Sequence, residues 1–101
     1  MTGTDDTPDH RQVAEWSDTT LAALDAVRGN REQLTDEQFL RDALHDVHAL
    51  RLVLDVIEGQ LLLAARSGAK PLLTWRALGD VLDMHYTSVR ERHDRLAEHH
   101  R

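Results

Sequence analysis

The fold of this chain is decided by residues 74–96, which read TWRALGDVLDMHYTSVRERHDRL. Apolar residues recur at helical spacing in the first part of this stretch, at Trp75, Leu78 and Leu82. This pattern predicts a short amphipathic helix that Thr74 caps, followed by a second helix from about residue 85 to 98. Two helices joined by three or four residues form a helix-turn-helix, whose second helix can lie in the major groove of DNA.

The connection between the two predicted helices has its own requirements. Gly79 is expected where the helices approach closely, because a side chain there would push them apart. Asp83 is expected in the turn, where a left-handed backbone favours glycine and tolerates Asp and Asn next best. We expect Met84 to be buried between the helices. The inward side of the second helix is expected to consist of Val89, His93 and Leu96.

The outward side of the second helix carries side chains that can read base pairs. Arginine can bond bidentately to guanine, and threonine can touch a thymine methyl group. The expected base-contacting residues are His85, Tyr86, Thr87, Arg90 and Glu91. Other polar residues around the two helices are suited to phosphate contacts, which position a protein without specifying sequence. These are Arg66, Lys70, Thr74, Arg76, Ser88, Arg92 and Arg95.

The middle of the chain predicts one long helix. From Phe39 to Arg66 there is no proline and one glycine, Gly59. Apolar residues follow an alternating three- and four-residue spacing at Leu40, Ala43, Val47, Leu50, Leu54, Ile57, Leu61 and Ala64. Thr35 and Gln38 predict a capping box at its start, and Gly68 a left-handed residue after its end. At about 1.5 Å per residue the helix would run roughly 42 Å, so it either projects from a monomer or packs against a partner. The expected dimerisation residues are Leu40, Val47, Leu50, Leu54, Ile57 and Leu61.

The N-terminal part is predicted to be helical after a polar tail. Residues 1–9 are rich in Thr, Asp, Gly and Pro and are expected to be disordered. Helical spacing runs from about residue 10 to 28, and Gly29 is expected to stop it. Ser17 could cap a second, shorter helix within this stretch, so one helix or two remain open.

Charge is distributed unevenly along the 101 residues, whose net charge is −6. Residues 1–65 contain 5 basic and 13 acidic residues, whereas residues 66–101 contain 7 basic and 5 acidic ones. A basic reading head on an acidic body would show this asymmetry. A chance variation in composition would also produce it.

Several functional classes find little support in the composition. There are no cysteines, which excludes disulfides and cysteine zinc sites and suits a reducing cytoplasm. No apolar run is long enough to span a membrane, and no signal peptide is expected. His45 and His48 lie three apart on one helix, but no second ligand pair accompanies them, so we expect no metal and no cofactor. No phosphate loop or nucleophile elbow is present, so we expect no enzyme.

These observations predict an all-α protein with an N-terminal helical segment, a long central helix and a C-terminal helix-turn-helix without a wing. Residues 10–66 would form a helical body and dimerisation region, and residues 67–101 a DNA-binding region, within one compact domain.

Residues 60–96 also resemble the helix-turn-helix segment of small actinobacterial DNA-binding proteins. The matching pieces are Ala64-Ala65-Arg66, Gly68-Ala69, Thr74-Trp75-Arg76-Ala77-Leu78-Gly79, Val81-Leu82-Asp83-Met84 and Arg90-Glu91-Arg92-His93-Asp94-Arg95-Leu96. The resemblance covers just over a third of the chain and implies a DNA-binding regulator. Two departures are Asp83, where the pattern has Gly, and His85, where it has a Ser cap, so the base-reading positions could shift by one.

The expected function is therefore that of a cytoplasmic, nucleoid-associated transcriptional regulator that binds double-stranded DNA as a homodimer. We expect no membrane partner and no small-molecule effector. The alternative is a protein–protein interaction module with the same helical fold, whose partner would be a sigma factor, a polymerase or a toxin. The acidic body favours that alternative, because acidic surfaces repel DNA.

Overall fold

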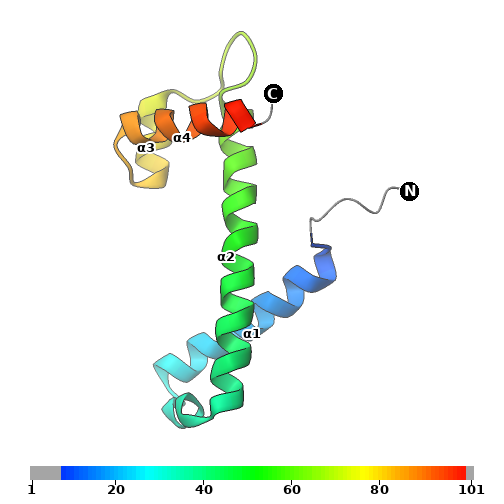
Figure 1. Ribbon diagram of the computed structural model, residues 1–101. Coiled ribbons are helices and arrows are strands. Elements are labelled where there is room, and N and C mark those ends of the chain that lie inside the picture. The colour runs from blue at the N-terminus through cyan, green and yellow to red at the C-terminus, as the bar shows by residue number, and fades with distance from the viewer. Residues whose placement is uncertain (1–7, 100–101) are drawn as a thin grey trace, which may run out of the picture. The chain divides into compact units, whose positions relative to one another are not determined.

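The computed structural model describes residues 8–99, and all its regular elements are helices (Figure 1). The elements are α1 (His10–Arg28), the 3-10 helix η1 (Arg31–Thr35), α2 (Glu37–Ala65), α3 (Trp75–Leu82) and α4 (Tyr86–His99). No strand occurs within residues 8–99, which confirms the all-α prediction. Of the expected N-terminal tail, residues 1–7 lie outside the described residues.

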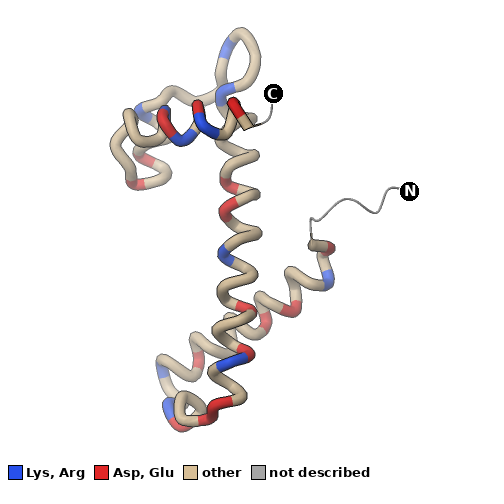
Figure 2. The backbone as a smooth tube through the Cα atoms, in the orientation of Figure 1, with Lys and Arg blue, Asp and Glu red and all other residues tan. Residues whose placement is uncertain are grey.

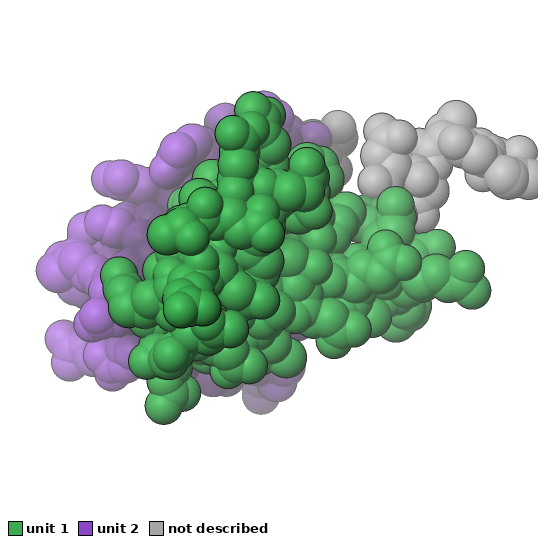
Figure 3. Space-filling model, turned by 90° about the horizontal axis from the view of Figure 1, so that it is seen from below, with its two compact units in different colours: residues 1–54 green, residues 55–101 purple. Residues whose placement is uncertain are grey.

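The chain divides into two compact units, which Figure 3 colours separately. Unit 1 extends to Leu54 and unit 2 begins at Asp55, so the division falls inside α2. The sequence had suggested a boundary at residues 66/67. Unit 2 therefore includes the last part of α2 together with α3 and α4.

The first helix is continuous, which settles the choice between one helix and two. Asp9 caps it: its carboxylate accepts a hydrogen bond from the Gln12 backbone N–H at 2.9 Å, and the Gln12 side chain accepts one from the Asp9 N–H at 3.2 Å. This reciprocal capping box satisfies two backbone donors that the helix leaves free. At the other end, Gly29 donates to the carbonyl of Asp25 at 2.8 Å, as expected for a stop.

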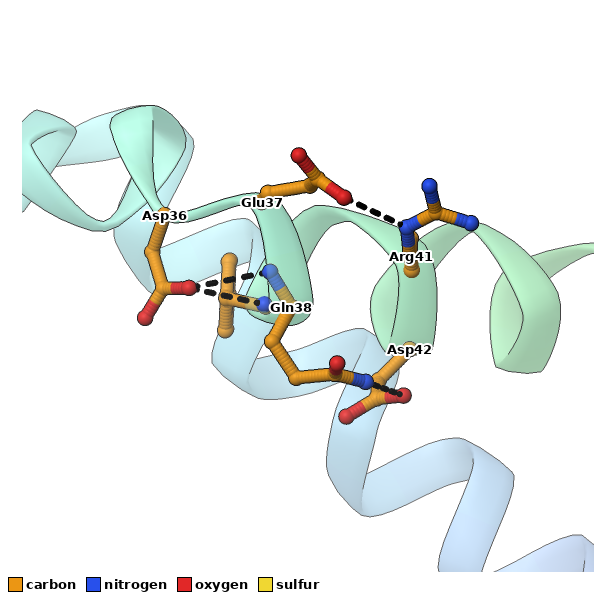
Figure 4. Close-up of polar contacts among 6 residues, drawn as sticks. Asp36, Glu37, Gln38, Arg41 and Asp42 are labelled. Carbon is orange, nitrogen blue, oxygen red and sulfur yellow. Dashed lines mark hydrogen bonds and ion pairs between the residues drawn. The ribbon is translucent and has the colours of Figure 1, made fainter.

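The start of α2 differs from the prediction. Asp36, not Thr35, caps the helix, and its carboxylate accepts hydrogen bonds from the backbone N–H groups of Gln38 at 3.0 Å and Phe39 at 3.3 Å (Figure 4). Thr35 ends η1, where its hydroxyl donates to the Glu32 carbonyl at 2.7 Å. The predicted Thr35–Gln38 capping box is therefore wrong, because the preceding 3-10 helix uses the threonine hydroxyl.

Unit 1 has small residues at its most buried points. Ala26 of α1 is fully buried and Ala43 of α2 is 6% exposed. Unit 1 also contains a polar contact, in which His45 Nδ1 lies 2.9 Å from Asp46 Oδ1. The hydrogen bond from His45 lowers the pKa of the Asp46 carboxyl, and a hydrogen bond from Thr19 of α1 lowers it further. Several large apolar side chains of the unit remain exposed, namely Leu21, Leu24, Val27, Leu44, Leu52 and Leu54.

Unit 2 is built on one buried residue from each of its three helices. Leu62 of α2, Leu78 of α3 and Val89 of α4 form the cluster, and all three are at most 5% exposed. The partly buried residues packed around it are Ala65, Trp75, Leu82 and Leu96. Removing apolar surface from water at this junction is the main force that holds α4 to the other helices.

The loop between α2 and α3 is tied to the end of α2. The backbone N–H of Leu72 donates to the Ala65 carbonyl at 3.0 Å, which satisfies an acceptor that the helix end leaves free. Gly68 has the predicted left-handed backbone, with a φ of 84°. The Thr74 hydroxyl accepts a hydrogen bond from the Ala77 N–H at 3.0 Å and caps α3, also as predicted.

The apolar stripe of α2 is covered only in part. Leu40, Val47 and Leu50 are half-buried within unit 1. In contrast, Leu54, Ile57 and Leu61 are 53%, 46% and 64% exposed. The second half of α2 turns a different side inward, since Leu62 and Ala65 pack in unit 2 instead.

Candidate nucleic-acid interface

The connection between α3 and α4 consists of Asp83, Met84 and His85. Asp83 adopts the expected left-handed conformation, with a φ of 53°. The Met84 N–H then donates to the Gly79 carbonyl at 2.9 Å. A Cβ atom on Gly79 would lie 2.6 Å from the Met84 carbonyl oxygen and 3.3 Å from the Tyr86 nitrogen. Gly79 thus permits the close approach that the sequence predicted.

Met84 does not occupy the predicted position. Its side chain was expected to be buried between the helices, but the residue is 37% exposed, so that prediction is wrong. The physical reason is the close approach at Gly79, which brings the backbone of Met84 against α3 and leaves little room for its side chain. Val89, which is fully buried, fills the space between the helices as predicted.

The start of α4 is capped by a histidine. The Nδ1 atom of His85 accepts a hydrogen bond from the Thr87 backbone N–H at 3.3 Å and lies 2.8 Å from the Thr87 hydroxyl oxygen. The imidazole nitrogen therefore takes the position in which a serine or threonine oxygen usually caps a helix. The rings of His85 and Tyr86 stack with their centroids 4.5 Å apart, which orders the entry to α4 further.

All five residues expected to contact bases are exposed and come from the entry and first turns of α4: His85, Tyr86, Thr87, Arg90 and Glu91. The opposite side of this helix is buried through Val89 and Leu96. At about 100° per residue, Thr87 and Glu91 lie on the solvent side of α4. The arrangement presents donors and acceptors on one exposed surface that the unit's core holds in place.

The residues expected to contact phosphates fall into two groups. Five are exposed around α3 and α4, namely Lys70, Thr74, Arg76, Ser88 and Arg95. Two are engaged within unit 2. Arg66 donates to the Leu73 carbonyl at 2.8 Å, and Arg92 pairs with Glu58 and with Asp55, the latter at 3.0 Å. These partners anchor the α2–α3 loop and α4, so Arg66 and Arg92 have structural contacts that the sequence reasoning missed. The partners of Arg92 are 34 and 37 residues away in the chain, and no local pattern could have revealed them.

Trp75 is the centre of a second group of contacts. The Arg66 guanidinium lies 4.2 Å from the centroid of its ring, and the His93 ring meets it edge-on at 5.1 Å. The Arg90 guanidinium lies farther away, at 6.0 Å, within the range of a cation–π attraction. Trp75 thus helps to orient Arg90, which the sequence had marked only as a base contact.

The charge of unit 2 is balanced. Residues 55–101 contain seven basic and seven acidic residues, because the unit includes Asp55 and Glu58. The cationic excess inferred for residues 66–101 therefore does not extend to the whole unit. Along α4, basic and acidic positions alternate, and its later turns carry the exposed acids Asp94 and Glu98 together with Arg95 (Figure 2). A polyanion would meet least repulsion at the first turns of α4.

The described residues offer neither a metal site nor a membrane-spanning helix. Within residues 8–99, no three His, Cys, Asp or Glu side chains gather in a way that could hold a metal ion. Across the same described part of the chain, no helix is both long and apolar enough to cross a membrane.

Comparison of the chain with models of known protein families, with curated proteins and with solved structures yielded no match.

Proposed function

We propose that this chain is a sequence-specific double-stranded DNA-binding regulator that acts as a homodimer. The α3–α4 pair serves as its helix-turn-helix, and α4 is the recognition helix. The single observation that carries the proposal is the exposed surface at the start of α4, where five polar or aromatic residues face solvent while Val89 behind them is fully buried.

The distribution of charge limits how α4 meets DNA. Its first turns carry Thr87, Arg90 and Glu91, whereas its later turns carry two acids, Asp94 and Glu98, and one exposed arginine, Arg95. Recognition helices commonly contact base edges with their N-terminal residues. We infer that α4 enters the major groove by its N-terminal end, with Arg90 bonding a guanine. Exposed cations such as Arg76 and Arg95 would contact phosphates on either side.

Two copies of the chain would bind DNA more tightly than one copy. Unit 2 has no net charge, so one copy would neutralise few phosphates, and phosphate contacts supply much of the affinity of DNA-binding proteins. A dimer doubles those contacts and reads two half-sites about 34 Å apart.

Fluorescence anisotropy tests the proposal. The full chain is titrated with the DNA that flanks its gene and with a random duplex, at two salt concentrations. Preference for the native DNA and a slope near −0.9 per phosphate contacted in the plot of log affinity against log salt would support the proposal. Absence of binding, or equal binding to both duplexes, would contradict it.

Two variants sharpen this experiment. Arg90→Ala removes a cation from the proposed reading surface and should cost about 1–3 kcal/mol at one base position while it relaxes base preference there. Arg41→Ala is the matched control, because Arg41 is an exposed arginine of α2 in unit 1 that pairs with Glu37. Equal losses in the two variants would show a general charge effect instead of base reading.

A second candidate function, binding to another protein, is favoured by exposed apolar side chains beside the same surface. Val81 of α3 is 75% exposed and Met84 in the turn is 37% exposed. Such side chains are typical of the apolar centre of a protein interface. If the anisotropy experiment shows no DNA binding, the parent protein and its Val81→Lys variant are compared in pull-downs with polymerase, sigma factors and toxins. Loss of a bound partner in the variant would support this second function.

A further inference from the structure

The side of α2 that points away from α4 is apolar and exposed. Gly59 marks the side that faces α4, because a Cβ atom there would lie 3.3 Å from Leu96 Cδ1. At 100° per residue, Ile57 and Leu61 lie about 160° around the helix from Gly59, on the opposite side. Both are exposed, at 46% and 64%, and Ala64 continues the same line at heptad spacing. We call Ile57, Leu61 and Ala64 the outer face of α2.

The outer face carries no charge. From Asp55 to Ala65 the only charged residues are Asp55 and Glu58, which lie about 40° and 100° around the helix from Gly59, and both pair with Arg92 of α4. Figure 2 shows α2 in tan, the colour of uncharged residues, from beyond these two acidic residues to its end. DNA is therefore a poor partner for the outer face, because its phosphates bind to cationic side chains. A charged protein surface is also a poor occupant, because its charges would lose water without gaining a partner.

We propose that the outer face of α2 is where a second copy of this chain binds. Two identical neutral faces meet without repulsion, and a two-fold axis places the same residues of both copies opposite one another. The spacing of Ile57, Leu61 and Ala64 is that of a helix–helix seam, in which such side chains interdigitate. This inference deepens the proposed function, from which the need for two copies comes. It also narrows the predicted interface, because Leu40, Val47 and Leu50 are already half-buried within unit 1.

Sedimentation equilibrium of the full chain without DNA tests the inference. The parent protein should dimerise reversibly, and Leu61→Lys should raise the dimer dissociation constant about 100-fold or more, because each dimer would bury two unpaired ammonium groups. Leu72→Lys is the matched control, since Leu72 is an even more exposed leucine of unit 2, at 84%, that lies outside the outer face. It should leave the dimer intact.

Three results would overturn the inference. They are a parent protein that stays monomeric, a Leu61→Lys variant that dimerises like the parent, and a Leu72→Lys variant that dissociates equally. A monomeric parent would leave the outer face to a different protein. Because the measurement contains no DNA, it separates this inference from the proposed function: an intact dimer that does not bind DNA would refute only the latter.

Cross-linking keeps the inference testable if Leu61→Lys loses its helical circular dichroism. The chain contains no cysteine, so introduced ones report without interference. A mixture of Ile57→Cys and Leu61→Cys proteins should form disulfide-linked dimers under mild oxidation, in either helix orientation. Leu72→Cys should form few. Equal cross-linking at all three positions, or no cross-linking at any of them, would refute the proposal that the outer face of α2 binds a second copy.

Discussion

Replacing Gly79 with alanine tests the contact that joins α3 to α4. The new Cβ atom would lie 2.6 Å from the Met84 carbonyl oxygen and 3.3 Å from the Tyr86 nitrogen, and both are backbone atoms that cannot rotate away. Overpacking of this kind costs about 1–3 kcal/mol, and a contact with fixed backbone belongs at the upper end. Alanine returns about 1 kcal/mol through its higher helix propensity. We therefore expect a net loss of about 2 kcal/mol in the free energy of unfolding.

Urea denaturation provides the assay. Trp75 lies in unit 2 beside this contact, so its fluorescence in a Trp16→Phe background reports on the unfolding of that unit. Gly59→Ala is the matched control, because its Cβ atom would meet only the flexible end of Leu96, at 3.3 Å. There the gain in propensity and the small displacement offset each other, and the change should stay within about 0.5 kcal/mol. A Gly79→Ala protein at least as stable as its parent would refute the close approach.

Substitutions at three further positions have defined outcomes. At Asp83, whose φ is 53°, glycine should be at least as stable as aspartate and valine about 2 kcal/mol less stable by thermal unfolding; a well-tolerated valine would contradict the left-handed turn. Arg92→Gln should lower stability by about 1 kcal/mol at low salt and by less at high salt, since the Asp55 side chain is 77% exposed and the Glu58 side chain 46%; a salt-independent loss would argue against the ion pairs. The pKa of Asp46 is lowered from 3.8, so its stabilisation is present above that pH and is lost as the pH falls through the lowered value. Asp46→Asn should accordingly be less stable than the parent at neutral pH and equal to it in strong acid; an unchanged difference would contradict the lowered pKa.

Local patterns in the sequence were enough to locate the helices of unit 2 and their connection. Thr74 caps α3, Asp83 takes the left-handed turn, Gly79 allows the close approach and Val89 is buried, all as predicted. The cap, the turn and the close approach depend on residues within about ten positions of one another, so backbone conformation and helical spacing determine them. The burial of Val89 also needs Leu62 of α2, to which it is packed.

Other features depended on competition between neighbouring elements. Thr35 could have capped α2, but η1 uses its hydroxyl, and Asp36 becomes the cap. Met84 is apolar and follows the pattern of a buried residue, yet its own backbone occupies the space beside Gly79. In both cases the sequence pattern was compatible with two outcomes, and the geometry of the adjacent turn selected one.

The sequence by itself determined that this protein is helical, where α3 and α4 begin and end, and which residues line the exposed start of α4. Only the tertiary structure decided how the long apolar stripe and the charges are used. Arg92 binds carboxylates more than thirty residues away, and α2 turns Leu62 inward while it leaves Leu61 exposed. The physical reason is that helical periodicity defines which residues share a side of a helix, whereas burial depends on which distant element packs against that side.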